Sequence, residues 1–161
     1  MKRFFYIPVL IVLFFTSCML LPLPQSAELE LSYSPNPVTD GTYSATNGWS
    51  FYADVTIKEK NNIGVTLGNH GPEGCCCYGQ LIVNGIVVET YYYDEDEVRS
   101  WFGTLRIDGG SSISEDNALF TTGNYTSAKM VETYYGKDDN GNIVSCTNTL
   151  ILNATKKIKK I

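Results

Sequence analysis

Residues 49–60, WSFYADVTIKEK, alternate between apolar and polar side chains from Trp49 to Lys58. The apolar positions are Trp49, Phe51, Ala53, Val55 and Ile57. Successive side chains of a β-strand point to opposite faces of a sheet. A period of two over this length therefore predicts a strand that is buried on one face and solvated on the other.

Two turn signals follow this strand. Asn61-Asn62 separates it from Ile63–Leu67, and asparagine tolerates a positive φ, so we expect a hairpin at this point. Asn84-Gly85 is typical of tight two-residue turns and lies in the middle of the apolar segment Leu81–Val88. It predicts a second hairpin.

A third hairpin is expected near the C-terminus. Ser127–Gly136 and Ile143–Leu152 have the composition of strands, and the polar residues Asp138–Asn142 form the turn between them. Oxygen-rich turns can bind Ca²⁺, but this turn lacks the spacing and the bidentate glutamate of an EF-hand loop. A plain hairpin turn explains it.

The remaining segments predict shorter strands. Leu29–Tyr33 alternates and suggests an edge strand, which Ser34–Pro37 interrupts because proline cannot donate to a ladder. Ser100–Ile107 predicts another strand, and Asn117–Phe120 a short return segment. One side of the former would carry Trp101, Leu105 and Ile107.

About seven short strands separated by turn signals indicate an all-β protein. The 161-residue chain is rich in tyrosine, with eleven, and poor in amphipathic helical segments. We therefore expect a single antiparallel β-sandwich over residues 29–155.

Four motifs of this region resemble the immunoglobulin-like domains of bacterial secreted and surface proteins. They are Asn36-Pro37, Trp49, Gly64–Leu67 and the hairpin Gly136–Asn142. The resemblance covers roughly residues 29–153 and implies one immunoglobulin-like β-sandwich. The chain departs from antibody domains in one respect, because no cysteine lies on the strand before the tryptophan.

The N-terminus has the organisation of an export signal. Two cations precede an apolar run from Phe4 to Phe15, and the small residues Thr16-Ser17 follow. Together with Cys18 this segment resembles the lipobox of bacterial lipoproteins, although Phe15 stands where that motif usually has leucine. The resemblance implies a signal peptide at residues 1–17 and several acyl chains on Cys18, which would form a stable membrane anchor.

Two alternatives remain for this end of the chain. A secretory signal cut after Ala27 would release the protein, and Phe4–Leu23 would be a membrane span. On the lipoprotein interpretation, residues 18–28 form a lipidated tether and residues 156–161 a basic tail. We then expect the protein in the bacterial cell envelope, on the outer membrane or the cell surface.

The charge of the chain disfavours one class of partner. The net charge is −5, and loss of residues 1–17 with their two cations leaves 144 residues at −7. An acidic protein is poorly suited to binding nucleic acid. The expected partners are the membrane, through Cys18, and an envelope protein or a glycan. The acidic run Asp94–Glu97 predicts a solvated loop.

Four cysteines fall within the predicted domain, at Cys75, Cys76, Cys77 and Cys146. Disulfides persist beyond the inner membrane, and adjacent cysteines bridge only with strain. We therefore expect a Cys77–Cys146 disulfide, which would stabilise the fold by about 2–4 kcal/mol through closure of a long loop. Free thiols are the alternative.

A thiolate site for Zn²⁺ or Cu(I) is a weaker alternative for the same cysteines. Cys75–Cys77 supply sulfur, and His70, the one histidine of the chain, lies five residues upstream. The Cys-x-x-Cys spacing of common zinc sites is absent. No nucleophile elbow or phosphate-binding loop accompanies His70, so we expect no catalytic residues and no cofactor.

The candidate ligand surface is aromatic. Its residues are Tyr91, Tyr92 and Tyr93, with Tyr134 and Tyr135 as further members. Neighbouring side chains of a strand point to opposite faces, so only part of this set can share one surface. We expect a non-catalytic binding or structural role in adhesion or as a scaffold. A carbohydrate-binding module and a metal or redox protein remain as alternatives.

Overall fold

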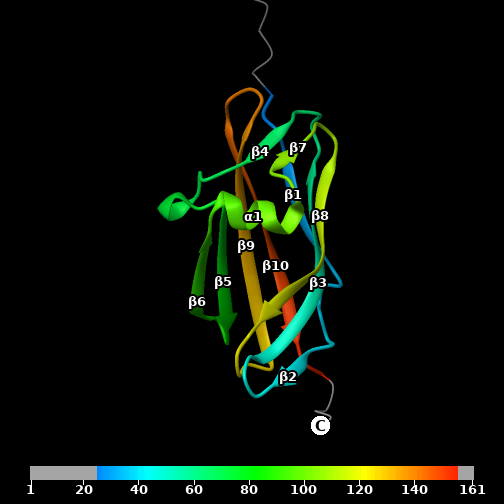
Figure 1. The fold of residues 1–161 in the computed structure, drawn as a ribbon, viewed down its shortest axis with the longest axis vertical. Helices are drawn as coiled ribbons and strands as arrows, with labels where there is room; N and C mark the ends of the chain where they lie inside the picture. The colour runs from blue at the N-terminus through cyan, green and yellow to red at the C-terminus, as the bar shows by residue number, and fades with distance from the viewer. Residues whose placement is uncertain (1–24, 156–161) are drawn as a thin grey trace, which may run out of the picture.

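The computed structural model describes residues 25–155, which form two antiparallel sheets and one α-helix (Figure 1). In chain order the elements are β1 (Leu29–Ser34), β2 (Thr42–Ser44), β3 (Gly48–Glu59), β4 (Val65–Leu67), η1 (Pro72–Gly74), β5 (Cys77–Val83), β6 (Ile86–Tyr93), α1 (Glu95–Phe102), β7 (Arg106–Ile107), β8 (Ser112–Thr121), β9 (Ser127–Asp138) and β10 (Ile143–Asn153). The expected all-β class is confirmed. The described residues form ten strands, three of which have only two or three residues, so the expected number of about seven is not confirmed.

β3 is the centre of the first sheet. It pairs with β1 and β2 along one edge and with β8 along the other. The predicted alternation is confirmed, because the apolar side chains from Trp49 to Ile57 are at most 5% exposed whereas Tyr52 is 49% exposed. The predicted edge strand is also present as β1, which pairs only with β3 within the described residues.

β9 is the centre of the second sheet. β10 pairs with one edge of β9, while β5 and β4 share its other edge. β6 extends the sheet beyond β5, and β7 extends it beyond β4. Both hairpins predicted in this sheet are confirmed. Asn84 and Gly85 have φ values of 51° and 81° in the β5–β6 turn, as a tight turn of this type requires.

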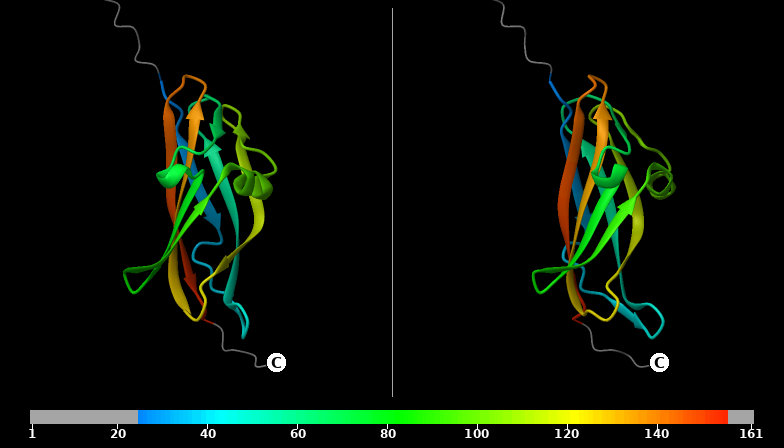
Figure 2. Two further views of the ribbon diagram at one scale, coloured as in Figure 1. Left: turned by 60° about the vertical axis from the view of Figure 1, so that its left-hand side comes forward. Right: turned by 90° about the vertical axis from the view of Figure 1, so that its left-hand side faces the viewer.

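The two sheets form layers around one hydrophobic core (Figure 2). On one side β1 lies near β10, and Val38 of the following loop bridges Leu152 of β10. On the other side β6 and β8 are edge strands, and α1 crosses between them (Figure 1). Val98 and Phe102 of this helix are buried, and the Phe102 ring meets Tyr134 edge-on at 5.8 Å.

The predicted hairpin at Asn61-Asn62 is wrong. β4 belongs to the second sheet, where it pairs with β7 and β9, so the chain crosses between the sheets after β3. Asn62 does adopt a positive φ of 58°. A positive φ at one asparagine thus permits a turn here, but local turn chemistry does not determine which strand the next segment joins.

The predicted acidic loop is also wrong, because α1 includes Glu95–Glu97. The predicted strand Ser100–Ile107 is present only at its end as β7, because its first three residues belong to α1. Asp94 Oδ1 accepts the backbone N–H of Asp96 at 2.9 Å and of Glu97 at 3.0 Å, and the Glu97 carboxylate accepts the N–H of Asp94 at 3.0 Å. This reciprocal capping starts a helix, and acidic residues favour its positive end. Gly103, with a φ of 72°, ends it.

Glu59, the last residue of β3, joins several loops at one end of the molecule. Its carboxylate accepts backbone N–H groups from Glu28 at 3.4 Å, Asn61 at 2.7 Å, Ile63 at 3.2 Å and Gly110 at 2.7 Å. Burial raises the pKa of Glu59, but these four donors outweigh burial and hold the pKa below its usual range.

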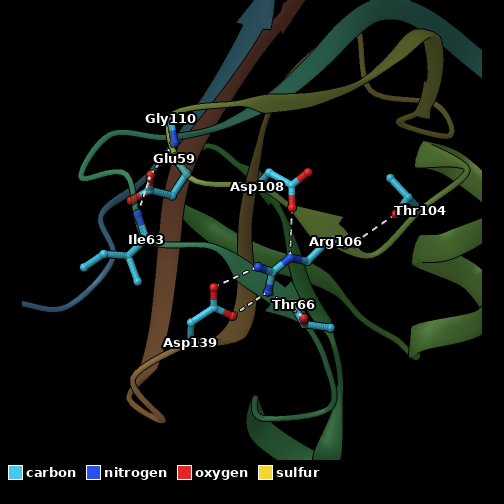
Figure 3. A network of polar contacts seen from close by, with 8 residues as sticks. All are labelled: Glu59, Ile63, Thr66, Thr104, Arg106, Asp108, Gly110 and Asp139. Carbon is cyan, nitrogen blue, oxygen red and sulfur yellow. Dashed lines mark hydrogen bonds and ion pairs between the residues drawn. The ribbon is translucent and has the colours of Figure 1, made fainter.

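Arg106 makes the neighbouring polar contacts (Figure 3). Its guanidinium donates to both carboxylate oxygens of Asp139 at 2.7 and 2.8 Å and to Asp108 at 3.2 Å. Asp138 accepts the turn N–H groups of Asn140 at 3.0 Å and Asn142 at 2.8 Å. The carboxylates of Asp138 and Asp139 at the β9–β10 turn thus have hydrogen-bond partners within the protein.

The described end of the predicted tether lies against this same end of the molecule. The N–H of Ala27 donates to Asp138 at 3.1 Å, and Asn140 donates to the carbonyl of Gln25 at 2.7 Å. Residues 25–28 therefore contact the domain. The predicted signal peptide, Cys18 and the basic tail 156–161 lie outside the described residues. Within residues 25–155 there is no helix with the length and hydrophobicity that a membrane crossing requires.

Candidate ligand-binding pocket

A pocket of about 230 Å³ lies between the sheets, on the side where β6 and β8 are edge strands. β6 contributes Tyr91 and Tyr93 to its lining, and α1 contributes Trp101. Glu115 of β8 and Glu132 of β9 also line it. The apolar lining from the first sheet includes Val55, Ala118 and Phe120.

The aromatic rings of the pocket lie in two orientations. The rings of Tyr91 and Tyr93 are nearly parallel, with an interplanar angle of 9° and centroids 6.0 Å apart. Trp101 meets Tyr93 at 76° with a centroid distance of 4.7 Å. Tyr91 and Tyr93 share a face because they are two positions apart on β6.

The three tyrosines of the candidate surface Tyr91–Tyr93 therefore lie on two faces of β6. Tyr92 points away from the pocket and packs on Tyr78 of β5, with ring centroids 5.4 Å apart. Burial raises the pKa of Tyr93 to about 12, so its hydroxyl stays neutral at physiological pH. The hydroxyl of Tyr91 donates to Glu89 on the same strand. Only Tyr91 and Tyr93 of the predicted trio line the pocket.

Glu132 is the buried carboxylate of this pocket. It is 6% exposed, and its Oε2 accepts the hydroxyl of Tyr33 of β1 at 2.8 Å. Burial raises the pKa of Glu132 to about 7, the hydrogen bond from Tyr33 opposes this rise, and the charge of Glu115 adds to it. Burial also raises the pKa of Glu115. A carboxylate with one donor thus titrates near neutrality.

Neither pocket carboxylate is neutralised by a described cation. The ion pairs among the described residues involve Lys60, Arg99 and Arg106 as cations, and none of these contacts Glu115 or Glu132. The pocket therefore combines electron-rich rings with uncompensated negative charge.

The predicted Cys77–Cys146 disulfide is wrong, because the cysteines of residues 25–155 are all free. Cys77 of β5 and Cys146 of β10 lie opposite Tyr134 of β9, one on each side of it. Neighbouring strands are about 4.8 Å apart, so strands that flank a third one are about 9.6 Å apart. A disulfide needs Cα atoms within about 7 Å.

The free thiols are not poised for metal or nucleophilic chemistry. Burial raises the pKa of Cys76 and of Cys146 to about 12, and it also raises the pKa values of Cys75 and Cys77. A thiol has to ionise to bind a metal or attack a substrate. Within the described part of the chain no three His, Cys, Asp or Glu side chains form a metal-binding group, so His70 and Cys75–Cys77 do not assemble into one.

Sequence reasoning missed Glu132, Glu115 and Trp101 as pocket residues. A usable signal existed for Glu132, which lies two positions from both Met130 and Tyr134 and therefore on the inward side of its strand. A carboxylate at such a position needs an explanation. Trp101 was assigned to a strand because α1 was not predicted, and no sequence pattern distinguishes Glu115.

No protein-family model and no curated protein matches this chain. A comparison with solved structures found Northeast Structural Genomics Consortium target SoR45, which is 11% identical, covers 83% of this chain and 91% of its own, and has a TM-score of 0.50. It also found a Bordetella pertussis protein provisionally named ApaA, which is 10% identical and has a TM-score of 0.47. The match covers 83% of this chain and 98% of that protein. At such low identity the first likeness concerns the fold alone.

Proposed function

We propose that this chain is a non-catalytic binding protein of the bacterial cell envelope, anchored through lipid on Cys18. In this proposal its two sheets form an immunoglobulin-like β-sandwich that holds a small ligand between them. The lipobox-like N-terminus supports the anchor. The two antiparallel sheets around one core support the immunoglobulin-like assignment.

The pocket is the observation on which the binding role rests. Tyr91, Tyr93 and Trp101 line it beside Glu132, a carboxylate whose pKa is raised to about 7. Ligand sites in proteins usually combine an aromatic or apolar lining with a few convergent polar groups. Strongly shifted pKa values also cluster at such sites.

Binding is favoured over catalysis by the dimensions of the pocket. Two carboxylates on one cleft also occur in glycosidases, where they flank the scissile bond. The volume of about 230 Å³ is small for that purpose, since ordinary ligand sites occupy roughly 300–1,000 Å³ and a glycosidase must hold sugar on both sides of the bond. We therefore expect no hydrolysis of nitrophenyl glycosides.

Native mass spectrometry of the full-length chain, incubated with small molecules extracted from bacterial envelopes, tests the binding role. We expect a bound mass on the wild-type protein that is lost in Tyr93→Ala and in Trp101→Ala. Tyr92→Ala is the matched control, because Tyr92 lies on the same strand but faces away from the pocket. Equal bound mass on the wild type and the three variants would show that the ligand binds outside this pocket.

Labelling of bacterial cells with an alkyne analogue of palmitate tests the anchor. The wild-type chain should acquire the label and sediment with membranes, because several acyl chains hold a protein firmly. Cys18→Ser should lose both properties, and Cys75→Ala should keep them. Mature wild-type protein that is unlabelled and begins downstream of Cys18 would refute the anchor.

An adhesion role is a second candidate, supported by the edge strand β6. Within the described residues β6 pairs only with β5, and its Ile86, Val87 and Val88 are 68%, 45% and 38% exposed. The β5–β6 hairpin leans away from the body of the molecule (Figure 2). A free edge with apolar side chains can accept a strand from a partner. Loss of cell–cell adhesion in Val87→Lys, with adhesion kept in Tyr52→Lys on the first sheet, would favour this role.

A further inference from the structure

We propose that the pocket between β6, α1 and β8 binds a small quaternary ammonium ion. The proposal rests on the proposed function, because it names the ligand class of the same pocket. It follows from three features of the pocket: the arrangement of the rings, the unpaired negative charge, and the volume.

The rings present electron-rich faces in two directions. Tyr93 and Trp101 meet nearly at right angles with centroids 4.7 Å apart, and Tyr91 lies parallel to Tyr93. Perpendicular aromatic walls surround a rounded group better than a flat one. A cation placed over such faces is attracted by the quadrupoles of the rings, most strongly by that of tryptophan.

The carboxylates supply the charge that such a ligand needs. Glu132 is 6% exposed and has the Tyr33 hydroxyl as its hydrogen-bond partner among the described residues. Glu115 adds a second acid to the same lining. No described lysine or arginine forms an ion pair with either acid. An organic cation in the pocket would therefore compensate a buried charge that the described residues leave unpaired.

The size of the pocket is the third feature. A quaternary ammonium has no hydrogen-bond requirement on its charged head. The volume of about 230 Å³ suits a head group of that size.

Calorimetric titration of the full-length chain with choline tests the proposal. The protein should be kept in a polyoxyethylene detergent, which has neither a cation nor a sugar. The matched ligand is 3,3-dimethyl-1-butanol, which has carbon in place of the charged nitrogen and nearly the same shape. We expect choline to bind at least tenfold more tightly than this neutral alcohol, because the alcohol keeps the shape and loses the charge.

Three variants locate the binding. Glu132→Gln and Trp101→Leu should each weaken choline binding at least tenfold, and Tyr92→Leu should leave it unchanged. Circular dichroism verifies that each variant is folded. If Trp101→Leu does not fold, Tyr93→Leu replaces it, since both residues line the pocket.

The pH dependence provides a readout that a merely structural role of Glu132 would not change. The titratable groups facing Glu132 are Tyr33 from β1, Cys77 from β5, Tyr93 from β6, Glu115 from β8 and Tyr134 from β9 itself. Of these only Glu115 carries charge near neutral pH. Choline keeps its charge at every pH, so its affinity should rise several-fold between about pH 6 and about pH 8 as Glu132 ionises. Glu132→Gln should abolish that rise.

Each alternative result has a defined meaning. Equal affinity for choline and the neutral alcohol would contradict the proposal that the ligand is a cation. The pocket would then be an apolar binding site. Binding of methyl glycosides but not of choline would also contradict that proposal and would favour a carbohydrate module. If none of the three probes binds, the quaternary ammonium proposal is wrong. The proposed function is wrong only if the pocket variants also retain the bound mass that the wild-type protein acquires from envelope extracts.

Discussion

Glu59 and Glu132 are both glutamates buried between elements of this fold, yet their pKa values move in opposite directions. Glu59 is 0% exposed and accepts four backbone N–H groups, and its pKa is lowered. Glu132 is 6% exposed, accepts one hydroxyl, and has a pKa raised to about 7. Burial opposes ionisation in both cases, so the number of donors decides the direction.

The difference separates a structural carboxylate from one available to a ligand. The donors of Glu59 come from loops near the end of β3, and Glu59 links these loops to one another (Figure 3). The protein itself therefore stabilises the negative charge of Glu59. Glu132 faces a pocket with most of its hydrogen-bonding capacity unused by the described residues. A buried acid of the second kind is retained at a cost in stability, which a bound cation would offset.

The largest expected effect is that of Glu59→Gln. The new amide group replaces one acceptor oxygen, so two of the four part-buried backbone N–H groups lose their partner. At about 2 kcal/mol for each, we expect the free energy of unfolding to fall by about 4 kcal/mol. Urea denaturation at neutral pH measures this loss. An unchanged midpoint would mean that water replaces the lost acceptor.

Glu132→Gln should have the opposite effect above neutral pH. The folded pKa of Glu132 is raised, so its protonated form contributes stability below the unfolded pKa, and this stability is lost as pH rises through about 7. We expect the variant to gain about 3 kcal/mol relative to the wild type between about pH 4.5 and about pH 8. Urea denaturation across this range, without ligand, measures the gain, and parallel curves for the two proteins would contradict it.

Tyr33→Phe removes the hydroxyl that is the donor to Glu132 among the described residues, and it should have an intermediate effect. A hydrogen bond to a charged group is worth about 1.5–3 kcal/mol, so the variant should lose about 2 kcal/mol where Glu132 is ionised and less where it is protonated. The carboxyl carbon of Glu132, followed by NMR, should titrate at higher pH than in the wild type. A lower titration midpoint would contradict the role of the hydroxyl.

Glu115→Gln should have the smallest effect. The charge of Glu115 raises the pKa of Glu132, so its removal should lower that pKa by a fraction of a unit. The same NMR titration measures this shift, and high salt should reduce the difference between the two proteins. Glu73→Gln is the control, because Glu73 does not line the pocket.

The sequence allowed the regular parts of the fold to be predicted. Alternation identified β3, and Asn84-Gly85 identified the β5–β6 turn, because both patterns depend only on neighbours along the chain. The capping box of Asp94 and Glu97 was also visible in the sequence and was overlooked. An acidic run was interpreted as a loop when its spacing favoured a helix start.

The site depends on pairings between distant segments and could be predicted only in part. Strand periodicity predicted that only part of Tyr91–Tyr93 could share one surface, and the structure shows that this part is Tyr91 and Tyr93. The distance between Cys77 and Cys146 depends on β9 lying between their strands, which no local pattern indicates. Sequence alone likewise gives no reason to bring Glu115 to the same pocket.

The contacts of residues 25–28 have a consequence for how the protein would stand on a bilayer. These residues are tied to the end that contains Glu59 and Asp138, whereas β10 ends at the opposite end of the molecule (Figure 1). A chain from Cys18 to Gln25 can reach no further than about 25 Å. With lipid on Cys18, the end of the domain that contains Glu59 and Asp138 would be held within about 25 Å of the headgroups.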